Sequence, residues 1–176
     1  LLSARGPVPS FQYGGAVGRA RPGPGIRETL ESAARRLTRA LGLVGLNGLD
    51  AVTGEGRARV LELNPRPTAT AELYESELPG GMVEAHLNAC RGRLPEGPVP
   101  EGPSRAVAVV YARERVAIPE LLPWPEWASD RPGPGSVLEP GQPICTAHAA
   151  GDTPEGAERR VRGRQLRLDG RLCGHR

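Results

Sequence analysis

The sequence contains no lysine, so every strongly basic side chain is an arginine. Aromatic residues are also scarce, with one Phe, two Trp and three Tyr among 176 residues. Arginine, glycine, proline and alanine are abundant instead, which indicates a biased genome composition more than a functional choice. The net charge of +3 is small, and the arginines alternate with acids up to about residue 150. This pattern excludes a basic stripe for nucleic acid over that part of the chain.

The chain has few cysteines and no long apolar segment. Its three cysteines, at positions 90, 145 and 173, are too widely spaced to resemble the framework of a disulfide-rich secreted domain. No apolar run approaches the length of a membrane-spanning helix, and the N-terminus lacks the charged-then-apolar pattern of a signal peptide. We therefore predict a cytoplasmic protein without nucleic-acid or membrane partners.

Residues 42–75 form the most informative stretch of the chain. The pattern predicts two short strands, at about residues 46–52 and 58–64, that pair as a hairpin. The residues between them, 53–56, read Thr-Gly-Glu-Gly, which suits a tight turn because glycine tolerates positive φ angles.

Three oxygen-bearing side chains of this hairpin are expected to converge. Side-chain alternation places Glu62 and Asn64 on one face of the second strand. A turn centred at residues 55–56 brings Asp50 opposite Leu61 or Glu62. Carboxylate and amide oxygens suit Mg²⁺, which commonly takes one or two carboxylates together with substrate phosphates. A solvated edge hairpin with polar tips is the alternative.

The residue string itself decides between these alternatives. The run Glu62-Leu63-Asn64-Pro65-Arg66 resembles the E-x-N-P-R metal-binding motif of ATP-grasp enzymes. The upstream run Gly45-Leu46-Asn47-Gly48-Leu49-Asp50 resembles the G-x-x-G-x-D strand of that family, which carries an earlier acidic ligand. The resemblance covers about residues 11–90.

The resemblance implies roles for particular residues. Asp50, Glu62 and Asn64 would hold Mg²⁺, with Mn²⁺ as an alternative ion, next to bound ATP. Arg66 would be the catalytic residue, binding the transferring phosphoryl group or the substrate carboxylate, for which a planar guanidinium is suited. Thr68 would contact substrate, although it is an equally good capping residue.

A glycine pair near the N-terminus is a second candidate for substrate or phosphate binding. The run Phe11-Gln12-Tyr13-Gly14-Gly15 predicts a short aromatic strand that ends in two glycines. The family often has a comparable segment where the backbone approaches the substrate. Gly14 and Gly15 would permit such an approach because they lack Cβ, but a plain turn is an equally good interpretation.

The same resemblance implies an α+β fold: the C-terminal lobe of an ATP-grasp fold, with an antiparallel sheet and covering helices, followed by a small β-rich domain. We expect the lobe at residues 1–92, a linker at 93–104 and the small domain at 105–176. The chain begins without an initiator Met, so we expect it to be the C-terminal part of a longer polypeptide or a truncated product. The missing N-terminal ATP-grasp lobe would then supply the lysines that contact adenine and phosphate.

Two helices are predicted in the first part of the chain. Residues 26–41 have apolar side chains at helical spacing and are followed by Gly42, a natural helix stop. A second helix is expected at residues 82–91, where His86 and Cys90 lie four residues apart. This spacing could hold a metal, but three further partners would be needed, so we favour a packed, hydrogen-bonded pair.

The last part of the chain predicts short strands and one helix. Residues 105–112 are expected to pair with 115–118, and residues 136–138 with 144–149. Cys145 and His148 would point to opposite faces of their strand, which argues against a zinc site. A helix is expected from Asp152 or Thr153 to about Leu166, apolar only at Ala157, Val161 and Leu166 and with its arginines on a solvated face.

Together these features predict an ATP-dependent enzyme that joins a small carboxylate to an amine through an acyl phosphate. The wording of the motif resembles most the branch with tyramine–glutamate ligase of methanofuran synthesis and the pyrrolysine-pathway ligases. A relative of biotin carboxylase is an alternative that the C-terminal segment suggests. A non-catalytic fragment or binding module is another alternative. The sequence leaves a homo-oligomer open.

Overall fold

A computed structural model describes residues 1–4, 12–95 and 102–173, without the side chain of Cys173. The chain divides into two compact units: Leu1–Arg19 with Pro103–Arg176, and Ala20–Gly102. The N-terminal residues therefore group with the C-terminal segment. The division at residues 93–104 stays a prediction, and residues 96–101 of that linker and Phe11 lie outside the described part.

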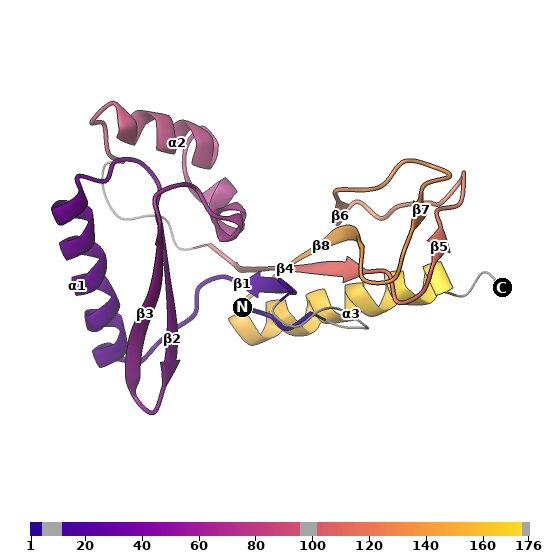
Figure 1. The fold of residues 1–176 in the computed structure, drawn as a ribbon, viewed down its shortest axis with the longest axis horizontal. Helices are drawn as coiled ribbons and strands as arrows, with labels where there is room; N and C mark the ends of the chain where they lie inside the picture. The colour runs from indigo at the N-terminus through magenta and orange to yellow at the C-terminus, as the bar shows by residue number, and fades with distance from the viewer. Residues whose placement is uncertain (5–11, 96–101, 174–176) are drawn as a thin grey trace. The chain divides into compact units, whose positions relative to one another are not determined.

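The unit Ala20–Gly102 is built around the expected hairpin, with a helix alongside it (Figure 1). The first helix ends at Gly42, whose φ of 60° closes it in the left-handed conformation, as expected. The hairpin turn lies at Glu55 and Gly56, both with positive φ. The elements in chain order are α1 (Pro24–Leu41), β2 (Gly48–Gly54), β3 (Arg57–Asn64), the 3₁₀ helix η1 (Ala69–Glu77) and α2 (Gly81–Cys90).

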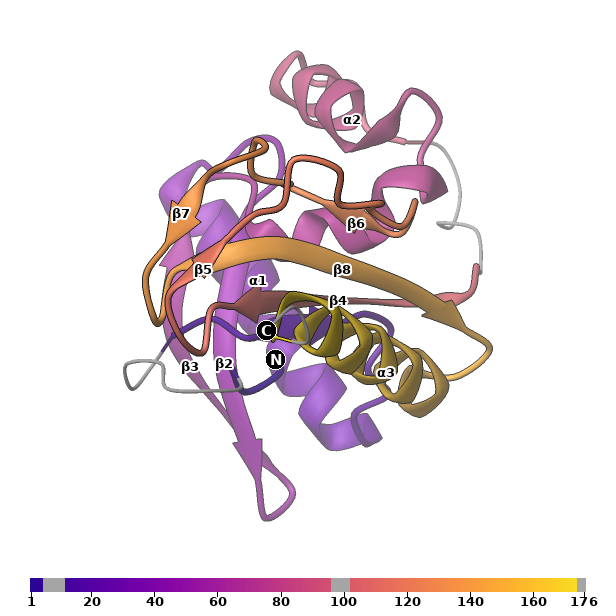
Figure 2. The same ribbon diagram turned by 90° about the vertical axis from the view of Figure 1, so that its right-hand side faces the viewer.

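The other unit is a small sheet covered by one long helix. Its elements are β1 (Gly15–Val17), β4 (Ser104–Tyr111), β5 (Val116–Ala117), β6 (Ala128–Ser129), β7 (Val137–Leu138), β8 (Pro143–Gly151) and α3 (Pro154–Cys173). Four strands form a sheet in the order β1-β4-β8-β6, and β5 pairs with β7. Every strand pair among the described residues is antiparallel, so the expected α+β class with antiparallel sheets is confirmed. Figure 2 shows α3 running along the β4–β8 pair.

Two predicted strand pairings are wrong. Residues 115–118 do not pair with β4, because β1 occupies one edge of β4 and β8 occupies the other. The N–H of Ala112 donates to the carbonyl of Gln142 at 2.9 Å, which extends the β4–β8 ladder beyond the position where the predicted hairpin would begin. Residues 137–138 pair with β5 instead of residues 144–149. Both errors have the same cause. The sequence pattern favours pairing between neighbouring segments, whereas β4 pairs with β8 and β5 pairs with β7, which lie further apart in the chain.

Helix α3 is longer than predicted, and its buried stripe differs from the expected one. The Thr153 hydroxyl accepts a hydrogen bond from the Gly156 N–H at 3.1 Å and so caps the helix start as expected. Leu166 is 48% exposed, so this apolar position is not part of the buried stripe. The buried stripe recurs at three- and four-residue spacing. It consists of Ala157, Val161, Gln165, Leu168 and Leu172.

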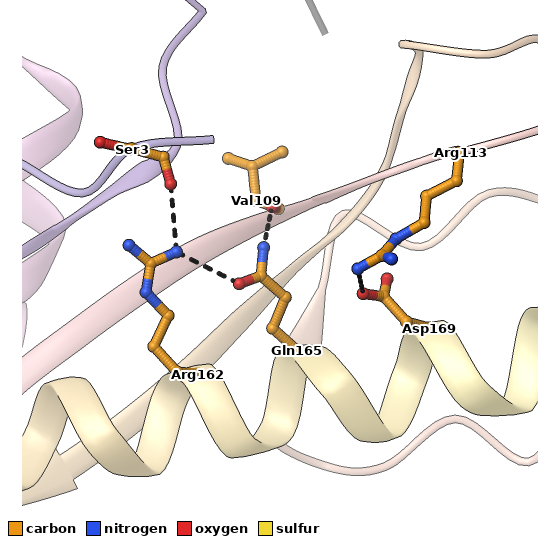
Figure 3. Close-up of polar contacts among 6 residues, drawn as sticks. All are labelled: Ser3, Val109, Arg113, Arg162, Gln165 and Asp169. Atoms are coloured by element: carbon orange, nitrogen blue, oxygen red, sulfur yellow. Dashed lines mark hydrogen bonds and ion pairs between the residues drawn. The ribbon is translucent and has the colours of Figure 1, made fainter. Parts of the chain in front are cut away.

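Polar side chains of α3 tie the helix to the strands and to the N-terminal segment (Figure 3). Buried Gln165 donates through Nε2 to the carbonyl of Val109 at 2.8 Å, and Arg162 donates to the carbonyl of Ser3 at 3.1 Å. Asp169 accepts from Arg113 at 2.7 Å.

Further arginines of α3 also contact backbone. Arg160 donates to the carbonyl of Ala150 at 2.5 Å, and Arg164 donates to the carbonyl of His148. Arg164 also lies over the Trp127 ring, 5.1 Å from its centre. The arginines are therefore only partly a solvated face. Trp124 and Trp127 pack against the core from their proline-rich loop.

Burial perturbs one thiol in this core. Cys145 on β8 is 2% exposed, and burial raises the pKa of its thiol from 9.0 to about 12, with the nearby charge of Asp130 acting in the same direction. Cys90, in the other unit, is exposed. The two cysteines form a matched pair for testing the effect of burial.

Alkaline pH is expected to destabilise the unit that contains Cys145. Between pH 9.0 and about 12 the unfolded thiol ionises while the folded thiol stays protonated, so the free energy of unfolding falls as pH rises. Below pH 9.0 this contribution is fully present. Cys145→Ala should flatten the fall between pH 9.0 and about 12 in urea unfolding followed by tryptophan fluorescence, and Cys90→Ala should not. Equal pH dependence in both variants and the parent would contradict the assignment.

Candidate functional site

The register of the hairpin brings the two acidic candidates together. Asp50 on β2 pairs directly with Glu62 on β3, one of the two partners that the sequence left open. Directly paired residues of antiparallel strands project to the same face, so the two carboxylates lie side by side. Asn64 lies two positions further along β3 and pairs with Gly48. The three candidate ligands therefore share one face at the open end of the hairpin.

A chain of polar contacts connects Asp50 and Asn64 with Arg66, the arginine of the motif. The Asn64 side-chain amide donates to Asp50 Oδ2 at 3.3 Å. Arg66 donates to Asn64 Oδ1 at 3.4 Å, and its backbone N–H donates to the Asn64 carbonyl at 2.8 Å. Asp50, Glu62 and Arg66 are exposed, and Asn64 is partly buried. Two carboxylates, an amide oxygen and a guanidinium thus lie together where a ligand can reach them.

The donor set fits one kind of metal better than another. Within residues 1–4, 12–95 and 102–173, no group of three His, Cys, Asp or Glu side chains could hold a metal ion. A structural zinc site normally needs four such protein ligands. Mg²⁺ takes one or two carboxylates and completes its shell with phosphate oxygens and water. Asp50, Glu62 and the amide oxygen of Asn64 fit this second case.

Thr68 packs against Gly48, the first residue of β2. A Cβ on Gly48 would lie 2.3 Å from Thr68 Cγ2. The Thr68 methyl therefore leaves no room for a side chain at the first residue of β2. The Thr68 hydroxyl lies 3.0 Å from the Thr70 hydroxyl, within hydrogen-bond distance. The threonine methyl is thus in contact with the strand that carries Asp50. Its role in substrate binding stays a prediction.

Gly14 and Gly15 belong to the other compact unit, where both are buried. A Cβ on Gly14 would lie 2.2 Å from the Ala4 nitrogen, and one on Gly15 would lie 2.1 Å from the Val107 carbonyl oxygen. Gly15 also has a φ of 131°. Close backbone packing therefore gives these glycines a structural reason. Their role in substrate or phosphate binding stays a prediction.

His86 and Cys90 form the packed pair that the sequence favoured, with His86 Nε2 3.7 Å from Cys90 Sγ. The sequence did not indicate the third member of this contact. The backbone N–H of Leu46 donates to His86 Nδ1 at 2.9 Å, across forty residues of chain. Gly45 was part of the quoted motif, and a Cβ there would lie 2.6 Å from His86 Nδ1. The only signal in the sequence was a glycine at this place, just before the predicted strand.

Comparison with known proteins gives one family match, which overlaps the hairpin. A family model described as an ATP-grasp domain matches residues 4–70, a range that includes Asp50, Glu62, Asn64 and Arg66. Residues 4–70 of the chain are therefore similar to part of an ATP-grasp domain. No curated protein matches it in sequence.

Solved structures share the ATP-grasp fold with the chain at low sequence identity. N5-carboxyaminoimidazole ribonucleotide synthetase from Thermus thermophilus is 19% identical, with a TM-score of 0.60, over 90% of this chain and 42% of that one. L-amino acid ligase from Bacillus licheniformis is 15% identical, with a TM-score of 0.69, over 88% and 43%. Urea carboxylase from Kluyveromyces lactis is 17% identical, with a TM-score of 0.67, over 85% and 15%.

The chain corresponds to only part of each of these solved structures. This chain spans less than half of the length of each of these three proteins.

In the described part of the chain, no helix combines the length and the apolar character needed to cross a membrane. A cytoplasmic location stays a prediction.

Proposed function

We propose that the protein is an ATP-dependent carboxylate–amine ligase and that this ATP-grasp chain supplies its metal- and phosphate-binding hairpin. The observation that carries the proposal is the shared face of Asp50, Glu62 and Asn64 with Arg66 in contact, inside the ATP-grasp match. Two carboxylates next to a guanidinium suit a ligand that brings both a divalent cation and phosphate.

The chemistry requires two anions, a carboxylate and the triphosphate of ATP, to approach each other. Mg²⁺ or Mn²⁺, when bound, neutralises phosphate charge and orients the γ-phosphoryl group. Asp50 and Glu62 would hold the cation by charge, and Asn64 Oδ1 would add a neutral ligand. Arg66 donates hydrogen bonds to the transferring phosphoryl group or to the substrate carboxylate. The carboxylate oxygen attacks the γ-phosphorus and ADP leaves, which forms the acyl phosphate. The amine then attacks the acyl carbon, which forms the amide and releases phosphate and a proton.

The ATP-grasp unit Ala20–Gly102 offers apolar surface for a further part of the enzyme. Among its described residues only Leu73 and Glu77 are buried. Val44, Val52 and Leu61 each expose more than half of their surface, on or next to the hairpin. No third strand among the described residues pairs with β2 or β3. These features support an N-terminal ATP-grasp lobe as the partner that covers this surface and contributes the ATP-binding groups.

The substrate assignment rests on the wording of the motif. The run Asn64-Pro65-Arg66-Pro67-Thr68, with the glycine pair Gly14–Gly15, favours the branch of tyramine–glutamate ligase and the pyrrolysine-pathway ligases. We therefore propose a ligase of one-carbon cofactor synthesis of the methanofuran type. A carboxylase related to biotin carboxylase is the competing assignment.

An assay of ADP release by the full-length protein tests the proposal. ATP and Mg²⁺ are supplied with panels of carboxylates and amines, including glutamate with tyramine, and separately with bicarbonate and biotin. ADP release that needs both a carboxylate and an amine supports the ligase. Release that needs bicarbonate and biotin supports the carboxylase instead. Absence of turnover with every combination, in a protein that also fails to bind ATP, would refute both and favour a non-catalytic module.

A further inference from the structure

The ligands lie at the end of the hairpin that its own hydrogen bonds hold least. The ladder of β2 and β3 is interrupted by a bulge between Asp50 and Ala51. Beyond the bulge, only three pairs remain up to the open end: Asp50↔Glu62, Leu49↔Leu63 and Gly48↔Asn64. Strand ends open locally more readily than strand centres, and a bulge weakens the connection to the rest of the ladder. Precise placement of Asp50 therefore requires a contact outside the hairpin.

Helix α2 supplies such a contact immediately before β2. The N–H of Leu46 donates to His86 Nδ1 at 2.9 Å. Gly45 lies directly on the imidazole, with a φ of 72° and no room for a Cβ. The Asn47 side chain donates to the Gly45 carbonyl at 2.9 Å, which fixes the turn internally. The turn at residues 45–47 is thus held by its own hydrogen bond and is attached to α2 through His86.

The hydrogen bonds also determine which nitrogen of His86 is protonated. Nδ1 accepts from an N–H group, so the neutral ring carries its proton on Nε2. Nε2 faces Cys90 Sγ at 3.7 Å, one helical turn further along α2. Cys90 thus contacts the side of the ring opposite Leu46, and it does not contribute to the acceptor.

The same helix is connected to the strand on the other side of the site. After Arg66 the chain continues through η1 into α2, and the Glu75 carboxylate accepts from the Met82 N–H at 3.1 Å at the start of that helix. The bond from Leu46 to His86 therefore closes a ring: β3, η1, α2 and back to β2. This closure spans the open end of the hairpin, where the ladder is short.

We propose that His86 is a positioning residue, which holds the start of β2 so that Asp50 stays opposite Glu62. The role rests on the proposed metal site, and His86 itself touches neither metal nor substrate. Its Nδ1 is the group that matters. A side chain with an acceptor at that position should replace it, and one without should not.

Hydrogen exchange in the full-length protein tests the positioning role without reference to activity. His86→Asn places an acceptor near the Nδ1 position, whereas His86→Gln places it near the Nε2 position, and His86→Leu has none. We expect amide exchange over residues 46–50 to rise about tenfold or more in the Leu and Gln variants. The Asn variant and the control Cys90→Ala should stay within about threefold of the parent. Unchanged exchange in the Leu and Gln variants would overturn the proposal, and if His86→Leu does not fold, the Gln and Asn pair decides.

Kinetics then separate this role from the proposed function. We expect the Gln variant to raise the Mg²⁺ concentration for half-maximal activity about tenfold, with kcat at saturating Mg²⁺ within about twofold of the parent. The Asn variant should restore the parent value. A parent enzyme whose turnover depends on Glu62, together with unchanged Mg²⁺ dependence in the Gln variant, overturns the positioning role alone. Turnover that is independent of Glu62 overturns the metal site, and the exchange measurement still reports whether His86 holds the strand.

Discussion

Replacing Glu62 by glutamine in the full-length protein is expected to lower Mg²⁺-dependent ATP turnover by about a thousandfold. Glutamine keeps the length of the side chain and its place opposite Asp50, but it removes the negative charge. A divalent cation supplies several kcal/mol of charge stabilisation in the transition state, and a loss of about 4 kcal/mol corresponds to this factor. The measurement is ADP release at saturating ATP over a series of Mg²⁺ concentrations.

The same hairpin contains a matched control for this substitution. Glu55 is also an exposed glutamate, but it lies in the turn, at the end of the hairpin away from Asp50. Glu55→Gln should leave turnover within about twofold of the parent, because a surface charge far from the cation contributes little. Retention of turnover by Glu62→Gln would remove Glu62 from the metal site. An equal loss in both variants would point to a destabilised hairpin instead of a lost ligand.

The hairpin could be predicted because its signals are local. A Gly-Glu-Gly sequence between two alternating strands specifies a tight turn, and a tight turn fixes the register of the residues next to it. The position of Asp50 followed to within one residue. The bulge between Asp50 and Ala51 selects Glu62 instead of Leu61, and the turn residues do not indicate this bulge.

The strand order of the other unit could not be predicted by the same means. The pattern predicts pairing between neighbouring segments. Strand β4 instead pairs with β8, which follows much later in the chain, and with β1, which lies far earlier. Sequence patterns indicate which residues are buried, but they do not indicate which strand edge a segment pairs with. The contact between Leu46 and His86 is of the same kind, since a histidine on a half-exposed helix gives no indication of the backbone group it will accept from.

Helix α3 shows how one polar residue can mislead a periodicity argument. Gln165 occupies a position in the buried stripe, where its amide donates to the Val109 carbonyl, so an apolar count passes over it and selects Leu166. The structure instead continues the stripe from Gln165 to Leu168. A buried glutamine is compatible with the core because its donor has a partner.

Leu168→Ala is therefore expected to destabilise the unit that contains α3 by about 3 kcal/mol, since removing a buried leucine loses transfer free energy and leaves a cavity. Leu168 is 1% exposed within the core cluster, whereas Leu166, two positions away on the same helix, is 48% exposed. Leu166→Ala should change the free energy of unfolding by less than about 0.5 kcal/mol. Both tryptophans of the chain pack against this core, so their fluorescence in urea reports the unfolding of this unit. Equal midpoints for the two variants would contradict the buried stripe, and a larger effect at Leu166 would restore the periodicity read from the sequence.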